Sequence, residues 1–442
     1  MKITAAIKPA VVAFLALALL VPVNMIQGLI QERQARRNEA VAGIAEGWGR
    51  RQTLAGPYLV VPYERTKVHV VQEVVDGKPR ERRNEHTSNE VLRLPADAVD
   101  WRIGAEVITK ARGIYKTRLF SATAEASGRF SVPARFGLPA DTPTSRIRFG
   151  TPRLVLGISD PQGIRSVSPL SGGGAAHAFV PGASDANVGG GVHAPLPELR
   201  TAEARTLEFA FSLELAGSEA LAVAPLGSNT AVTMRSDWPH PSFAGRFLPL
   251  RSEISREGFS ADWKVSQYAS PGTSPGQELA VFFIEPAGLY QQLERGSKYG
   301  FLFIGLTFAA FLLFELLRRL AIHPIQYALV GLALAMFFLL LTALSEHIAF
   351  GRAYAIATLA CVGLISGYLM RVLRSAFAGL GFGTALTALY AMLYALLKAE
   401  DYSLLGGSLL LFGLLAVVMI ATRRIDWYEL TRNRSVSGAQ EA

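Results

Sequence analysis

The chain has 442 residues, half of them hydrophobic, and a mean hydropathy of +0.28. Its formal net charge is +9, but much of the Lys and Arg excess lies beside apolar segments, which argues against a nucleic-acid-binding surface. The one cysteine, Cys361, excludes a disulfide framework and a cysteine-rich zinc site.

Six apolar segments are long enough to cross a bilayer, whose hydrocarbon core requires roughly 20 apolar residues in a helix. We predict spans at residues 10–29, 299–317, 325–344, 353–370, 376–397 and 402–422. Five of these six segments carry no charged residue at all, whereas a soluble helix of that length has a charged face. The first segment has no small-x-small cleavage pattern, which favours a retained anchor over a cleaved signal peptide.

The orientation of the spans follows from the Lys and Arg residues at their ends. Basic pairs or clusters follow the second, fourth and sixth spans, at Arg318–Arg319, Arg371–Arg374 and Arg423–Arg424. These ends are predicted to be cytoplasmic, so both termini are inside and the long polar segment is outside. Arg33, Arg36 and Arg37 favour the opposite orientation, but they begin a long loop, where the charge rule is weak.

The predicted organisation has five parts. They are an anchor at 1–29, a helical stalk at 30–56, a mostly-β periplasmic domain at 57–298, a five-helix bundle at 299–422 and a cytoplasmic tail at 423–442. Apolar residues recur at helical spacing from Ile26 to Trp48, and Gly56-Pro57 is expected to end the stalk.

Alternation with period two replaces the helical pattern after the stalk. Strands are predicted at 58–64, 67–75, 80–94, 113–132, 146–158 and within 204–236, with turns at Asp76-Gly77, Gly217-Ser218 and Gly227-Ser228-Asn229. The fold class is therefore a membrane α-helical bundle with a large mostly-β domain, either a sandwich or a curved sheet. The Gly-rich stretch 171–197 is predicted to be a flexible surface loop without a nucleotide site.

Motifs for catalysis or metal binding are missing from the sequence. The seven histidines form no HExxH pattern, and no GxSxG is present. Glu346-His347 is the strongest polar pair at a membrane face, but adjacent helical residues point in different directions and are poor co-ligands. Glu315 is close enough to Arg318 and Arg319 for a local ion pair. We therefore expect no enzymatic activity, no cofactor and no metal.

Eight distinctive motifs are spread along the chain. They are LAGPYLVVPY (54–63), RGIY (112–115), SDWPHPSFAGRFLP (236–249), ISREGFSADWKVS (254–266), SKYGFLFIGLTFAAFLLFE (297–315), HPIQYALVGLALAMFFLLLTALSEHIAF (323–350), EDYSLLGGSLLLF (400–412) and MIATRRIDWY (419–428). Together these motifs resemble the CreD family. The resemblance covers nearly the whole chain. It implies a bacterial inner-membrane protein with a periplasmic domain, linked to cell-envelope integrity and colicin tolerance. It implies no catalytic residue.

Three functions remain open at this point. The first is a non-enzymatic envelope-integrity protein, anchored in the lipid bilayer, whose β domain binds a periplasmic protein or an envelope component. The alternative is a membrane transport or lipid-transfer protein that uses the domain as a conduit, and the third is an enzyme on lipid or glycan precursors.

The residues expected to contact the bundle or a partner lie in two places. The stiff loop after Asp237 contributes Trp238, His240 and Phe243, and two turns at the predicted periplasmic face contribute Glu346, His347, Glu400 and Asp401. We expect the two turns to form a seat for the domain by receiving basic groups such as Arg295 or Lys298.

The predicted topology has a direct test. Reporter fusions after Gly172 and after Arg434 should report opposite sides of the membrane, because five spans separate them. Activity of both fusions in the same compartment would exclude the six-span arrangement.

Overall fold

The computed structural model describes residues 7–75, 78–172, 175–183, 185, 189–200, 203–269, 277–283, 288–318, 323–373, 375–398 and 403–423. The chain divides into two compact units. Residues 1–38 and 287–442 form the helical unit, and residues 39–286 form the sandwich unit. The sandwich unit is therefore an insertion between the first predicted span and the remaining ones.

The helical unit contains α1 (Ile7–Ala18), the first part of α2 (Leu20–Trp48), α3 (Leu289–Arg318), α4 (Pro324–Ser345), α5 (Phe350–Val372), α6 (Ala376–Lys398) and α7 (Ser403–Thr422). The break between α1 and α2 falls at Leu19, where Pro22 lacks the N–H that would bond to Ala18.

Within the described residues, four helical segments are long and apolar enough to cross a membrane. They are Phe14–Trp48, Pro324–Ser345, Phe350–Val372 and Ala376–Lys398. The other two predicted spans are helical as α3 and α7 but are not among these four, so the structure supports four spans and not the predicted six.

Helices α5 and α6 approach closely through glycines. A Cβ at Gly383 would lie 2.3 Å from Ser366 Oγ, and one at Gly379 would lie 2.9 Å from the Met370 backbone nitrogen. The four-residue spacing places both glycines on one face, as in small-xxx-small contacts between membrane helices. The two helices can therefore lie this close together only because glycine has no side chain at these two positions.

The sandwich unit consists of two nine-stranded sheets. Sheet A contains β1 (Gln52–Val75), β2 (Lys78–Pro95), β5 (Ser145–Phe149), β6 (Arg153–Ile158), β10 (Val180–Pro181), β11 (Gly191–Pro195), β13 (Ala220–Ala224), β15 (Pro241–Gly245) and β18 (Leu279–Phe283). Sheet B contains β3 (Ala98–Arg112), β4 (Tyr115–Val132), β7 (Ile164–Val167), β8 (Leu170–Gly172), β9 (Ala175–His177), β12 (Arg205–Ser218), β14 (Asn229–Ser236), β16 (Arg251–Ser255) and β17 (Gly258–Ser266).

Both sheets are mixed. The order in sheet A is β10-β11-β6-β1-β13-β18-β15, with β2 and β5 also paired to β1. The order in sheet B is β16-β17-β14-β3-β4-β12-β8-β9, with β7 also paired to β12. The β1–β13 and β14–β3 pairs are parallel, and the other pairs are antiparallel.

One hydrophobic core joins the two sheets. Trp101 of β3 is fully buried and packs edge-on against Phe211 of β12, while Phe120 of β4 meets Phe283 of β18 in sheet A. Along β3, buried and exposed residues alternate from Val99 to Glu106. This period of two places one face of the strand in the core and the other in solvent, as the sequence predicts for the β domain.

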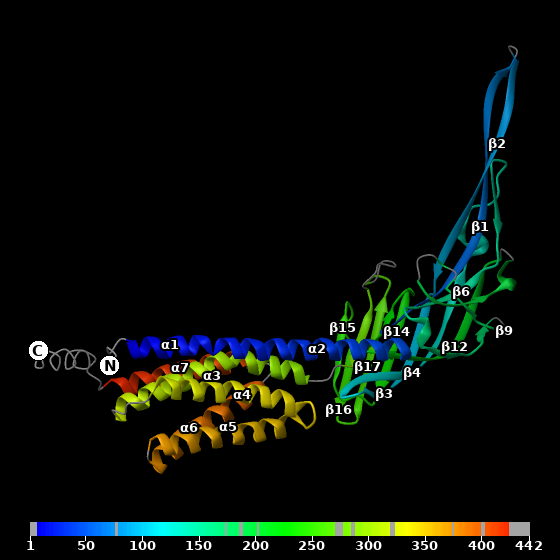
Figure 1. The fold of residues 1–442 in the computed structure, drawn as a ribbon. Helices are drawn as coiled ribbons and strands as arrows, with labels where there is room; N and C mark the ends of the chain where they lie inside the picture. The colour runs from blue at the N-terminus through cyan, green and yellow to red at the C-terminus, as the bar shows by residue number, and fades with distance from the viewer. Residues whose placement is uncertain are drawn as a thin grey trace, which may run out of the picture. The chain divides into compact units, whose positions relative to one another are not determined.

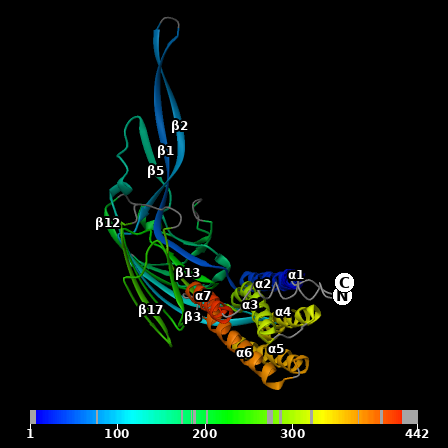
Figure 2. The ribbon, with the colours of Figure 1, turned by 90° about the vertical axis from the view of Figure 1, so that its left-hand side faces the viewer.

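A long two-stranded arm extends from the sandwich (Figures 1 and 2). Strand β1 is flanked by β2 and β5 as far as Lys67, and the Val68 N–H still donates to the Thr144 carbonyl, but residues 69–75 pair with β2 alone. The described side chains near this end are exposed and mostly polar or charged, which disfavours pairing of further strands with the arm.

The structure changes two predicted boundaries. Helix α2 ends at Trp48, not at residue 56, because Gly49 takes a φ of +137° against the Ala216 carbonyl and β1 begins at Gln52. Gly56-Pro57 instead lies inside β1, at a register shift between Ala55 and Tyr58, where a proline is tolerated in a strand.

The glycine-rich stretch 171–197 is more ordered than predicted. Its described residues include the end of β8 and all of β9, β10 and β11. Asp185 is buried between Tyr58, whose hydroxyl lies 3.1 Å away, and Arg93, whose Nε donates at 2.7 Å. Burial, reinforced by the Asp185 carboxylate, raises the pKa of Tyr58 far above its usual value. This polar cluster holds the stretch against sheet A.

The structure confirms only some of the predicted turns between strands. Gly227-Ser228 does separate β13 from β14, but Gly217-Ser218 ends β12, and the turn follows at Glu219, which has a φ of +64°. The predicted Asp76-Gly77 turn lies outside the described residues, although β1 and β2 pair up to Val75 and Lys78 on either side of it.

The contact between α5 and α6 is testable with a matched set of glycine substitutions. Gly379→Leu and Gly383→Leu should each lower the stability of the full chain in detergent by about 1–3 kcal/mol, because the new side chain overpacks the contact. Gly381→Leu is the control, since a Cβ there meets nothing within 4 Å. Thermal unfolding compares the three variants, and equal losses in all three would contradict the close-contact assignment.

Candidate functional site

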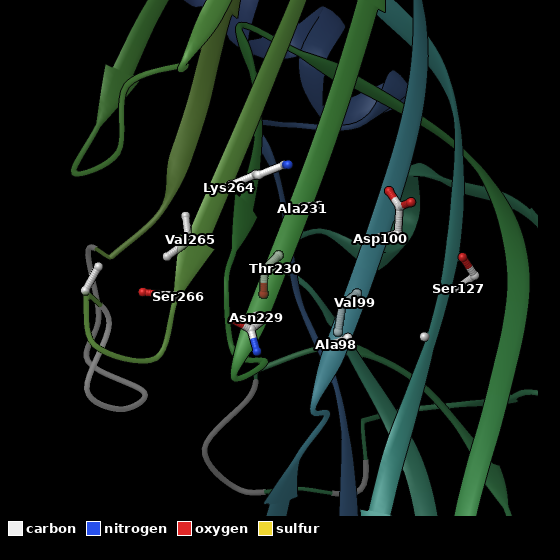
Figure 3. Close-up of a pocket in the computed structure, with 12 residues that line it drawn as sticks. Ala98, Val99, Asp100, Ser127, Asn229, Thr230, Ala231, Lys264, Val265 and Ser266 are labelled. Carbon is white, nitrogen blue, oxygen red and sulfur yellow. The ribbon is translucent and has the colours of Figure 1, made fainter.

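The outward face of sheet B carries a shallow hollow of about 450 Å³ (Figure 3). Strands β17, β14, β3 and β4 border it side by side. A second hollow of about 790 Å³ shares Ala98, Ser127 and Gly128 with the first and continues to β12 and β8. Together the two hollows form a groove across seven neighbouring strands, from β17 to β9, which we call the sheet-B groove.

The strand register decides which side chains meet in the groove. Lys264, Ala231, Asp100 and Ser127 are paired in that order across four strands. Strands lie about 4.8 Å apart, so the backbones at Lys264 and Asp100 are separated by about 10 Å. Ala231 between them leaves a depression with an ammonium group on one side and a carboxylate on the other (Figure 3).

Gly128, which lines both hollows, stands where sheet B packs closely against its core. A Cβ at Gly128 would lie 2.1 Å from the Ala98 carbonyl oxygen and 2.7 Å from the Phe209 ring. Any larger residue at this position would displace the neighbouring strand or the core. Gly128 therefore serves the close packing of sheet B against its core.

The groove is lined by polar and charged groups as well as small apolar residues. It offers the Ser127 and Ser266 hydroxyls, the Asn229 amide, the Lys264 ammonium and the Asp100 carboxylate. Asp100 also lies 3.9 Å from Arg102 on the same strand, and both side chains are well exposed. Donors, acceptors and both signs of charge suit non-covalent recognition of a polar ligand. Sequence reasoning missed this site because only the register brings these residues together.

The predicted loop at residues 238–243 belongs largely to the sandwich core. Trp238 is half-buried against the core, donates its indole N–H to the His240 carbonyl at 2.9 Å and lies under the Arg118 guanidinium. Phe243, in β15, packs edge-on against Phe259 and Trp263. These contacts favour a structural role for Trp238 and Phe243, while His240 is exposed.

Glu346 joins three helices of the helical unit. Its carboxylate accepts a hydrogen bond from the Tyr290 hydroxyl of α3 at 3.3 Å and lies 3.7 Å from Arg33 Nε of α2. Its side chain is only 10% exposed, so this pair is more shielded than a surface ion pair. The structure thus gives Glu346 a partner, Arg33, that the sequence did not suggest.

The remaining predicted contacts are only partly described. Lys298, suggested as a partner of the membrane turns, pairs with Glu294 within α3 at 2.8 Å. His347 is exposed at the end of α4. Glu400 and Asp401 lie outside the described residues, so the proposed pairing of the two turns remains a prediction.

A metal centre is not evident in the part of the chain that the structure describes. No group of three or more His, Cys, Asp or Glu side chains there is arranged to hold an ion. In the helical unit, Cys361 contacts the Tyr390 hydroxyl at 3.3 Å, and Tyr354 donates to the Tyr390 carbonyl at 2.6 Å. These polar groups satisfy one another inside a largely aromatic cluster.

The fold and these sites define a class: a helical membrane protein with a β-sandwich inserted after its first span. The family model described as "Inner membrane protein CreD" matches residues 4–428. Inner membrane protein CreD of Escherichia coli (strain K12) is 36% identical over 424 residues, which cover 93% of this chain and 91% of that protein. The chain belongs to the CreD family of inner membrane proteins.

Similarity to solved structures adds little. Two structures of an M1 zinc metallopeptidase, one of them named as from Deinococcus radiodurans, align at 14% and 11% identity with TM-scores of 0.22. The alignments cover 71% and 68% of this chain and 89% and 87% of those proteins. Values this low carry no inference about the activity of the CreD-family chain.

The aromatic residues of the 238–243 loop are expected to stabilise the sandwich. Phe243→Ala should lower the free energy of unfolding by about 2–4 kcal/mol, because it removes the ring contacts with Phe259 and Trp263 and leaves a cavity beside them. Hydrogen exchange of β15 and β17 in the full chain measures the loss of protection. His240→Ala is the exposed control, and an unaltered exchange pattern in Phe243→Ala would favour a docking role for the ring.

The Arg33–Glu346 pair can be isolated by a double-mutant cycle. Arg33→Gln and Glu346→Gln should be non-additive by about 1 kcal/mol in detergent unfolding, because the partly shielded charges interact directly. The control cycle uses Glu32 and Arg36, an exposed pair within one helix, for which the coupling should be about 0.3–0.5 kcal/mol. Strict additivity at Arg33 and Glu346 would show that the contact contributes nothing.

Proposed function

We propose that this CreD-family chain is a non-enzymatic inner-membrane protein that maintains the cell envelope by binding a polar envelope component in the sheet-B groove. In this proposal the sandwich faces the periplasm and both termini are cytoplasmic. The observation that carries it is the groove, because it combines hydroxyl, amide and charged groups on a rigid sheet without a catalytic arrangement.

The packing of the sandwich supports binding over transport. A conduit for lipid needs an apolar passage, whereas the space between the two sheets is filled by side chains such as Trp101, Phe120 and Trp263, all buried. The outward face of sheet B instead presents small and polar residues, such as Ser127 and Ala231. A ligand would therefore lie on the surface of the sheet and contact several strands at once.

Charge reversal in the groove tests the function. Lys264→Glu and Asp100→Lys should abolish the ability of the gene to restore detergent resistance to cells that lack their own copy, because each reverses one side of the depression. Arg83→Glu, on an exposed part of the arm, is the control and should restore resistance fully. Hydrogen exchange verifies that the sandwich remains folded. Full resistance with both groove variants would exclude the groove as the binding site.

A further inference from the structure

Strands β3 and β4 continue beyond sheet B as a second two-stranded projection, which we call the finger, residues 106–118. Strand β14 pairs with β3 only up to Ala105, and β12 pairs with β4 only from Leu119. Between these limits the two strands pair only with each other, from Glu106 to the Arg112–Tyr115 pair. Gly113, with a φ of +62°, allows the tight turn at the tip.

Beyond Glu106 at its base, the finger carries only basic charged residues. Residues 107–124 contain Lys110, Arg112, Lys116 and Arg118 and no acidic residue. Lys110, Arg112 and Lys116 are exposed and have no carboxylate partner among the described residues. The tip residue Ile114 is 44% exposed although it is a large aliphatic side chain. An exposed aliphatic residue within a ring of cations is typical of a surface that enters the interface of an anionic membrane.

The finger lies along the helix that leads to the membrane. Lys110 lies over the Trp48 ring at 5.5 Å, and Arg112 lies against Gly43, where a Cβ would be 2.8 Å from its Nη1. The tip side of the finger therefore lies closer to the N-terminus of α2 than its base does. The predicted first span ends near Leu29, 14 residues before Gly43 in the chain, which corresponds to about 21 Å of helix.

We propose that the finger binds the membrane surface, with Ile114 in the headgroup region and Arg112 and Lys116 on the phosphates of anionic phospholipids. The number of α2 residues between the predicted end of the span and Gly43 limits the distance from Gly43 to the membrane surface. The thickness of the headgroup layer and the reach of the long basic side chains reduce the distance between the finger and the lipid phosphates. The site is separate from the sheet-B groove, so it does not depend on what the groove binds.

A fluorescent reporter on the full chain tests this proposal. Ile114→Cys is made in a Cys361→Ala background, labelled with an environment-sensitive dye and placed in nanodiscs of phosphatidylcholine, with or without phosphatidylglycerol. The dye should report an apolar surrounding only when the anionic lipid is present, and 0.5 M salt should reverse the signal by screening the charges. A dye at Asn84→Cys, on the exposed arm, is the control and should report water in both lipids.

Charge variants complete the test. Replacing both Arg112 and Lys116 by Gln should reduce the equilibrium constant for tip binding about 30-fold, because each basic group near an anionic surface contributes a factor of about five. Arg83→Gln, on the exposed arm, should leave the signal unchanged. A water-like signal from Ile114→Cys in both lipids, or an equal response to neutral and anionic lipid, would overturn the proposal.

Discussion

The need to pair every backbone N–H and C=O inside hydrocarbon determines the organisation of this chain. Helices satisfy these groups within one segment, so the apolar stretches become helices, and the strand-rich segment must fold outside the membrane. Because that segment is inserted after the first predicted span, the sandwich unit is connected to the helical unit at both ends of its sequence.

Within the sandwich, the alternation of inward and outward side chains along the strands forms both the core and the groove. Inward residues such as Trp101 and Trp263 fill one core between the sheets, while outward residues on the same strands, such as Asp100 and Lys264, form the groove. The shared strands make the groove rigid, because its residues cannot move without disturbing the core. A rigid polar surface lowers the entropy cost of binding an extended polar ligand.

Two hairpins extend beyond the sheets, and they differ in character. The arm of β1 and β2 carries both acidic and basic residues, such as Glu85 and Arg83, whereas the charged residues of the finger beyond Glu106 are all basic. Isolated two-stranded ribbons are marginally stable, so contacts beyond the ribbon are required. The finger obtains them from α2 at Trp48 and from Trp238 through Arg118.

The sequence by itself determined the apolar helices, the β character of the inserted domain, the β1–β2 pairing and membership of the CreD family, because hydrophobic period and motif identity are local properties. It misplaced the end of α2 and took the stretch around Asp185 for a flexible loop, since Gly49 and the Tyr58–Asp185–Arg93 cluster depend on distant residues. Only the tertiary structure decided the sheet-B groove and the Arg33–Glu346 pair. Strand register and helix packing join residues up to about 300 positions apart, and no local pattern encodes those contacts.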